Sequence, residues 1–303
     1  MKNNSFVALS ITVALGAVNI LAQPTPANFI DLVSKRLSGY GSGSNPMPIS
    51  PESISKFCAL DKSPLAKRVL TEYGAIFAAA NEVQLPGVCI FPDERAVQDF
   101  RSKLKTRIAV IDGVEIELQE VAMNSLFLVA DDAKTVGIKI IPLDGSIAAG
   151  RTYFDTVRIW YSRFDPALKY WIARGKIATD DEAALRALPL EKQMEKVIEW
   201  ESRGLLFGTG HALSIFSSTA PPGTSQHLSL LAFDVARFPS EKLIAIFNSH
   251  GWFQTVKGDP QHFTYLGLSE SDLPGRGLRS MYYDGIKYWL PNVPEGDPII
   301  HLN

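Results

Sequence analysis

The sequence has no excess of charge of either sign. Its 30 Lys and Arg residues nearly balance 32 Asp and Glu residues, so the formal net charge is −2. Nucleic-acid-binding domains carry a basic surface, and this balance therefore argues against a nucleic-acid partner. Hydrophobic residues make up 46% of the chain and aromatic residues 10%, which is the composition of a globular protein rather than a disordered one.

The motifs of two common classes of protein are also missing. No serine lies in a Gly-x-Ser-x-Gly elbow, which makes a serine hydrolase the least favoured enzyme class. The Gly-Thr-Gly-His sequence that ends at His211 has neither Walker spacing nor a Rossmann context, so it is a weak indication of phosphate binding. A structural role is the more common one for a histidine such as His211.

Only one long apolar run occurs, and it lies at the N-terminus. It extends from Phe6 to Ile20, follows the positively charged Lys2, and is succeeded by Ala22 and a polar, proline-bearing segment. This pattern predicts a secretory signal peptide over residues 1–22, cleaved after Ala22. An uncleaved anchor is the alternative, but the run is short for a membrane span. We therefore expect an exported protein, periplasmic or extracellular, with no membrane span after the signal peptide is removed.

Cysteine is scarce, with Cys58 and Cys89 the only two in the chain. In an oxidising compartment the pair is expected to form a disulfide, and two buried free thiols are the alternative. No histidine lies near either cysteine in the sequence, which argues against a zinc site there.

The pattern of the remaining chain predicts an α+β fold. Glycine, serine and proline between Gln23 and Ser50 indicate a flexible linker. Asp112-Gly113 between two apolar runs indicates a β-hairpin. The runs that follow predict a helix over 119–136 and a strand over 138–143. The expected organisation is a signal peptide (1–22), a linker (23–50), a mostly helical N-terminal extension (51–106) and a catalytic domain (107–303).

Three of the five histidines lie between Thr219 and Leu266, among carboxylates. His227 precedes an apolar, strand-like run that contains Asp234, and His262 begins a second such run. If these strands are antiparallel neighbours, the three side chains can converge on one face of the sheet. Two imidazoles and one carboxylate form a catalytic type of zinc set, which leaves a fourth position for water. Asp259 lies three residues before His262, close enough to act as a general base.

Several residues of this stretch resemble a known family. Ser225, His227, Ala232 and Asp234 match the pattern Ser-x-His-x-x-Gly-x-Ala-x-Asp of the zinc D-alanyl-D-alanine carboxypeptidases of the vancomycin-resistance type. The sequences Gly-Trp at 251–252 and Asp-Pro-Gln-His-Phe at 259–263 are similar to the closing arm of the same family. Leu230 departs from the pattern, where the family has glycine, and an aspartate stands at 259 where the carboxypeptidases usually have glutamate.

The resemblance implies a fold and an activity. The fold would be that of the hedgehog and D,D-peptidase domains, a small antiparallel sheet flanked by helices. His227, Asp234 and His262 would bind Zn²⁺, and Asp259 would activate the zinc-bound water. Arg151 would stabilise the oxyanion, although Arg158 and Arg163 lie nearby in the sequence as competitors for that role.

The same resemblance implies a substrate. Tyr153 and Ser225 would contact a peptidoglycan stem peptide that contains D-amino acids, and the expected reaction is D,D-carboxypeptidase cleavage. An L-alanyl-D-glutamate or D,D-endopeptidase is the alternative within this chemistry. A non-catalytic cell-wall-binding module on the same fold is the alternative from another class.

Overall fold

The computed structural model describes residues 27–39, 56–60 and 62–293. The expected signal peptide and much of the expected linker lie outside these residues. The described part is an α+β fold with eight α-helices and three small antiparallel sheets. The helices are α1 (Phe29–Gly39), α3 (Pro64–Tyr73), α4 (Glu94–Arg101), α5 (Glu120–Thr135), α6 (Tyr153–Ala173), α7 (Thr179–Arg186), α8 (Leu190–Ser202) and α9 (Glu241–Ser249). None of these helices is long and apolar enough to cross a membrane.

The central sheet contains the strands that the site depends on. Its order is β3 (Ala232–Asp234), β5 (His262–Tyr265) and β4 (Trp252–Phe253), and both pairings are antiparallel. Asp234 lies directly opposite His262 in the β3–β5 register. The expectation that these two strands are antiparallel neighbours is therefore confirmed.

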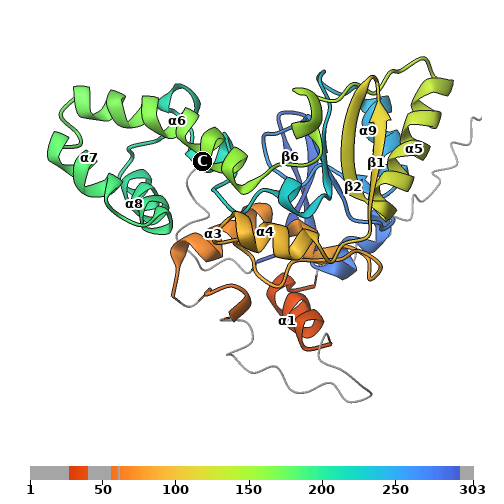
Figure 1. Cartoon of the computed structure of the whole chain (residues 1–303), viewed down its shortest axis with the longest axis horizontal. Helices are drawn as coiled ribbons and strands as arrows, with labels where there is room; N and C mark the ends of the chain where they lie inside the picture. Colours follow the sequence, from red (N-terminus) through yellow and green to blue (C-terminus); the bar gives the residue numbers. More distant parts are fainter. Residues whose placement is uncertain (1–26, 40–55, 61, 294–303) are drawn as a thin grey trace, which may run out of the picture.

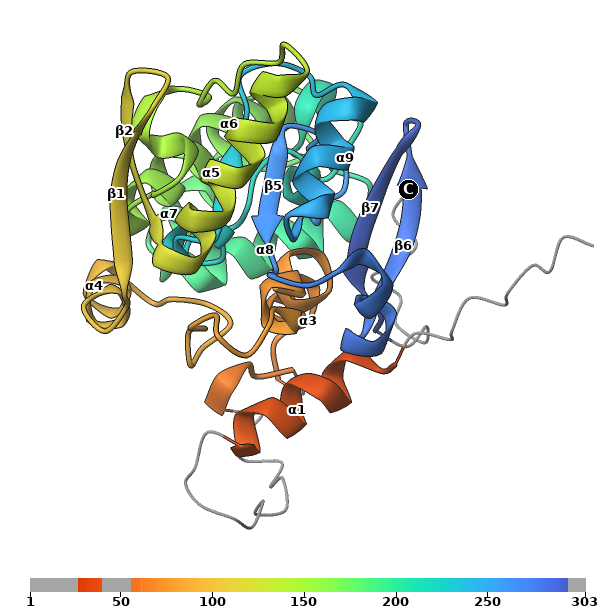
Figure 2. The ribbon, with the colours of Figure 1, turned by 90° about the vertical axis from the view of Figure 1, so that its right-hand side faces the viewer.

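Two β-hairpins lie on either side of this sheet (Figure 2). One pairs β1 (Thr106–Ile111) with β2 (Val114–Gln119), and the other pairs β6 (Leu278–Tyr283) with β7 (Ile286–Pro291). The first turns at Asp112 and Gly113, whose φ angles of 50° and 80° are those that a two-residue hairpin turn requires. The hairpin predicted from Asp-Gly is confirmed, and so is the helix that follows it, as α5.

The prediction of a strand over 138–143 is wrong. Only an isolated bridge between Pro142 and Val235 forms there. Pro142 has no N–H to donate to a ladder, and Asp144 turns the chain away with a φ of 56°. The segment reaches the sheet at one point and then leaves it.

The hydrophobic core includes residues from the region expected to be linker and extension. Phe263 of β5 stacks on Phe247 of α9, with ring centroids 4.0 Å apart. The same buried cluster contains Phe29 and Val33 of α1 and Ile76. The linker expectation is therefore wrong for α1, because its apolar residues four apart are buried against the domain. Phe57, Leu70 and Val83 likewise belong to the buried cluster that contains Phe263 of the central sheet.

Helices α6, α7 and α8 form a lobe that projects from the rest of the molecule (Figure 1). The lobe has its own buried cluster, in which Trp160 and Phe164 are 1% and 0% exposed. Trp160 and Phe164 of α6 are thus core residues of the lobe. The buried Arg68 of α3 joins the lobe to the rest of the molecule, since its Nη1 lies 3.2 Å from Oε2 of Glu201 in α8.

Cys58 and Cys89 form a disulfide that closes a loop with a sequence separation of 31. Replacing both by serine is expected to lower the free energy of unfolding by about 3–4 kcal/mol, because the unfolded chain gains the freedom of the opened loop. Urea unfolding of the variant beside the wild type measures this change. Reduction of the wild type should reproduce it, and identical unfolding midpoints for both proteins would contradict it.

Candidate metal centre

Three buried side chains converge at one end of the central sheet. His227, Asp234 and His262 are 1%, 5% and 5% exposed. His227 Nε2 lies 3.2 Å from His262 Nδ1 and 3.3 Å from Asp234 Oδ2, and His262 Nδ1 lies 2.8 Å from Asp234 Oδ1. The three residues could hold a metal ion between them, as the sequence predicted.

The tautomer of His227 is fixed by a carbonyl. Its Nδ1 lies 3.1 Å from the backbone oxygen of Ala149, which can only accept a hydrogen bond. Nδ1 therefore carries the proton and donates it to Ala149. The lone pair of Nε2 is left facing Asp234 and His262.

The tautomer of His262 is fixed by Gln226, a residue for which the sequence gave no role. Gln226 Nε2 donates to the Tyr73 carbonyl at 2.9 Å, so the amide oxygen must be the atom that faces His262. His262 Nε2 lies 2.9 Å from that oxygen and donates to it. Thr264 also donates its hydroxyl to the same oxygen. The lone pair of His262 is consequently on Nδ1 and points at the centre.

These assignments leave two nitrogen lone pairs and a carboxylate directed at one another. Acceptors in such an arrangement repel unless a proton or a cation lies among them. In a tetrahedral zinc site with bonds of about 2.0–2.2 Å, neighbouring ligand atoms are about 3.3–3.6 Å apart. The separations of 3.2 and 3.3 Å lie at the lower end of this range and the separation of 2.8 Å lies below it, so His262 and Asp234 would have to move apart to hold such an ion. Backbone and amide acceptors that orient ligand histidines are typical of metal sites.

Electrostatics favour the metal-binding protonation states. Burial lowers the pKa of His227 to about 4. Burial alone would raise the pKa of Asp234, but the two histidines beside it hold that pKa well below its ordinary value. At neutral pH His227 is therefore a neutral imidazole and Asp234 a carboxylate.

Acid is expected to destabilise the metal-free protein. Between the ordinary histidine pKa of 6.5 and the folded value of about 4, the unfolded chain protonates His227 while the folded protein does not. The unfolded state then binds more protons, so the free energy of unfolding falls as the pH is lowered through this window, by roughly 3 kcal/mol at most. Urea unfolding in the presence of chelator at about pH 7 and about pH 5 measures the loss. A His227→Gln variant should lose less of its free energy of unfolding between these two pH values. An equal loss in the variant would show that protonation of His227 is not the cause.

Arg101 of α4 holds the backbone of the site in place. Its Nε donates to the Leu228 carbonyl at 3.0 Å, and its Nη2 donates to the carbonyls of His227 and Arg151 at 3.0 and 2.7 Å. One guanidinium thus joins the turn η5 (Gln226–Ser229) to the loop that carries Arg151. The sequence could not have indicated this role, because Arg101 lies 126 positions from His227.

Leu230 stands where the family that the sequence resembles has glycine, and the structure shows how the leucine is accommodated. It has a φ of 55° and a ψ of 37°, a left-handed conformation in which glycine is unstrained. Its side chain is 1% exposed, and it packs so closely on Gly150 that a Cβ there would lie 3.1 Å from Leu230 Cδ2. The backbone turn is therefore the one that a glycine would make. The left-handed conformation is strained for leucine, but its side chain fills buried space beside Gly150.

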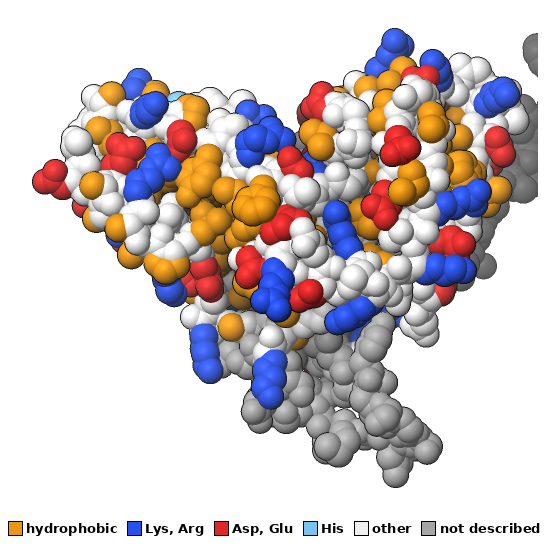
Figure 3. All heavy atoms as spheres, viewed as in Figure 1, with side chains coloured by type: hydrophobic (Ala, Val, Ile, Leu, Met, Phe, Trp, Pro, Cys, Tyr) orange, Lys and Arg blue, Asp and Glu red, His pale blue; other side chains and the backbone are white. Residues whose placement is uncertain are grey.

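A cavity of about 500 Å³ opens beside the three residues. It lies between the helical lobe and the central sheet, where Figure 3 shows a notch bordered by charged side chains. Sites for small ligands typically have this size. Six of the predicted site residues line it: Arg151, Ser225, His227, Asp234, Asp259 and His262.

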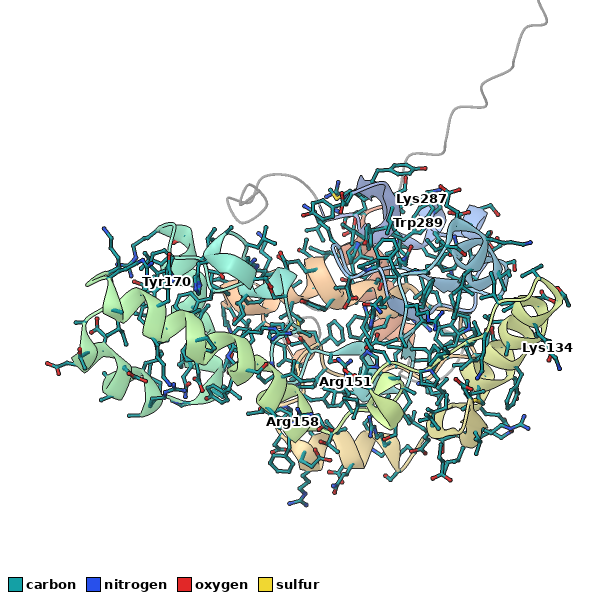
Figure 4. All side chains as sticks on the ribbon, turned by 90° about the horizontal axis from the view of Figure 1, so that it is seen from above. Lys134, Arg151, Arg158, Tyr170, Lys287 and Trp289 are labelled. Carbon is teal, nitrogen blue, oxygen red and sulfur yellow. A yellow bond between two sulfur atoms is a disulfide. The ribbon has the colours of Figure 1, made fainter. Side chains whose placement is uncertain are left out.

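Arg151 and Asp259 both line the cavity that contains the three residues. Arg151 Nη2 lies 2.5 Å from Asp234 Oδ2. The Asp259 side chain is partly accessible to solvent at the cavity. The surrounding protein still removes part of its hydration, and this desolvation raises the pKa of its carboxyl group. Figure 4 places Arg151 and Arg158 near the start of α6, at the junction of the two parts of the molecule. Of these two arginines, Arg151 is the one that contacts the metal-ligand set.

The turn that carries Asp259 is held by the C-terminal hairpin. Gln254 Nε2 donates to the Pro260 carbonyl at 2.5 Å, and Trp289 N donates to the Gln254 carbonyl at 2.9 Å. Tyr288 is 1% exposed, and the Gly258 N–H is directed at its hydroxyl. Strand β7 thereby fixes the turn on the side away from the cavity.

Replacing Tyr288 by phenylalanine is expected to loosen this turn without opening a cavity in the core. If Asp259 acts as a base, kcat/KM for peptide hydrolysis should fall about 10-fold, since small misplacements of a catalytic group are costly. Steady-state kinetics measure the change, with bound metal expected to stay constant. Tyr282→Phe, at a tyrosine 72% exposed on the same hairpin, is the matched control. Equal rates in the two variants would contradict the role given to Tyr288.

The structure does not bring Tyr153 into the cavity. Tyr153 is the first residue of α6 and packs against a small cluster that contains Phe91, Val97 and Leu228. The capping box between Thr152 and Asp155 sets the start of the helix and turns Tyr153 towards that cluster. Tyr153 is therefore not among the predicted site residues that line this cavity, and its contact with substrate stays a prediction.

The other two described histidines do not join the centre. His211 stacks on Tyr170 with ring centroids 3.6 Å apart, in agreement with a structural role. His250 Nε2 lies 2.7 Å from Asp132 Oδ2.

Comparisons of the chain with protein-family models, curated proteins and solved structures found no match.

Proposed function

We propose that the protein is an exported zinc peptidase that hydrolyses peptidoglycan stem peptides, with the fold of the D,D-peptidases and hedgehog domains. The observation that carries the proposal is the convergence of two histidine lone pairs and a carboxylate in a cavity that also contains Asp259 and Arg151. The sequence resemblance supports the peptide substrate and favours D-alanyl-D-alanine carboxypeptidase activity.

In this mechanism His227, Asp234 and His262 would hold the ion. A bound zinc ion would supply Lewis acidity, which lowers the pKa of water towards neutrality. Asp259 accepts the proton of the attacking water and passes it to the leaving amine. Its raised pKa suits this exchange, because a stronger base accepts a proton more readily. Arg151 places a positive charge where negative charge develops on the carbonyl oxygen.

An endopeptidase acting on an L–D or D–D bond is the second candidate. The observation that favours it is the aspartate at position 259, where glutamate is usual in the carboxypeptidases that the sequence resembles. Both candidates use the same residues and differ in the bond that is cleaved.

Elemental analysis of the purified protein, combined with product analysis on a muramyl pentapeptide, tests the proposal. We expect about one zinc per chain and the release of free D-Ala, both lost with a chelator and restored by zinc. Internal cleavage without free D-Ala would assign the endopeptidase. A protein that takes up no zinc when the metal is supplied would refute the mechanism.

A further inference from the structure

One wall of the cavity that contains the candidate metal centre is formed by α6. Arg158, Ile159, Ser162 and Arg163 line the cavity from this helix. The last three lie one, four and five residues after Arg158, which places all four on one face of the helix. The opposite face of α6 packs into the core of the lobe through Trp160 and Phe164. The helix therefore fixes the position of the two arginines relative to the site.

The two arginines differ in how their charge is balanced. Arg158 Nη2 lies 3.2 Å from Asp155 Oδ1. Asp155 also accepts hydrogen bonds at Oδ2 from the backbone and hydroxyl of Thr152. Arg163 makes no hydrogen bond or ion pair with any residue that the structure describes. Its side chain therefore supplies a positive charge at the cavity that no described carboxylate neutralises.

Several hydroxyl groups line the same cavity as Arg163. Ser162 precedes it on the helix, and a run of hydroxyl groups from Ser217, Ser218 and Thr219 lines the cavity as well. The carboxylates that line the cavity are Asp144, Asp234 and Asp259, none of which lies on α6. Guanidinium and hydroxyl groups together complement a ligand group with several acceptor atoms and a negative charge.

We propose that this face of α6 binds a carboxylate of the substrate and so makes the enzyme selective for peptides that carry this carboxylate. The inference rests on the proposed function, because it assigns the substrate class of the same site. The carboxylate is either the free C-terminus of the peptide or the side chain of an acidic residue within it. Both present the same chemistry to Arg163, and suitable peptides distinguish them.

The test uses three peptides that share one scissile bond. The first has a free C-terminus and one acidic residue, the second is its C-terminal amide, and the third has the acidic residue replaced by its amide. Arg163→Ala should raise KM about 10-fold for the peptides that keep the recognised carboxylate, the effect of one charge-assisted hydrogen bond, with kcat nearly unchanged. Arg163→Lys should restore much of the loss. The peptide that lacks the recognised carboxylate should show the same KM with wild type and variant.

Lys169→Ala is the matched control, since Lys169 is an exposed cation on α6 that does not line the cavity. Calorimetric binding of the same peptides to the zinc-free protein separates this inference from the proposed function. A preference for the carboxylate peptide that Arg163→Ala removes would support the inference even if no peptide is hydrolysed. Equal binding of all three peptides, absence of binding, or an equal loss in Lys169→Ala would overturn it.

Discussion

A His262→Ala variant is expected to lose stoichiometric zinc and at least about 10³-fold in the rate of peptide hydrolysis, because the ion supplies the acidity of the attacking water. The loss of metal follows from the geometry. His262 Nδ1 is one of three inward-facing donor atoms, and two remaining ligands do not complete a zinc site. The substitution also leaves the oxygen of Gln226 without its imidazole partner. Elemental analysis and the release of D-Ala measure the two losses on the same samples.

His250→Ala is the control for this prediction. It removes an imidazole that interacts with Asp132 instead of the centre, so zinc and activity should both be retained. Circular dichroism and thermal melting of the two variants show whether each is folded. A folded His262→Ala protein that keeps one zinc per chain would contradict the ligand assignment, whatever its activity.

The three polar residues that could hold a metal ion were predicted from the sequence because they lie on or next to strands with recognisable patterns. Each apolar run and its flanking turn is a local signal, and the β3–β5 register places Asp234 opposite His262. The residues that orient the ligands could not be found in this way. Gln226 lies 36 positions from His262, and Ala149 lies 78 positions from His227. Contacts of this kind are set by the packing of the whole chain.

The same distinction explains the errors in the expected fold. The turn at Asp112-Gly113 is determined by two adjacent residues, so its prediction succeeded. The burial of α1 depends on contacts with distant parts of the chain, and the loop composition after it suggested a linker instead. The resemblance to the carboxypeptidases placed Tyr153 in the site together with Arg151. The first turn of α6 directs the two side chains to different surroundings.

Replacing Asp259 by asparagine is expected to lower kcat by about 10²–10⁴-fold, the usual contribution of a general base, while zinc remains bound. Asparagine has nearly the same shape but cannot accept the proton of the attacking water. Asp259 lies at the rim of the cavity and is not one of the three inward-facing ligands, so metal content should be unchanged. Single-turnover hydrolysis and elemental analysis of the same preparation give the two quantities.

Asp144→Asn is the matched control, since Asp144 is a second carboxylate that lines the cavity. It should leave kcat within about 10-fold of the wild type, because only a base within hydrogen-bond reach of the water takes its proton. If Asp259→Asn lost its zinc as well, Asp259 would be a metal ligand. If it kept both zinc and full activity, the proton would have to go to another group, and Asp144 would then be the first carboxylate in the cavity to test.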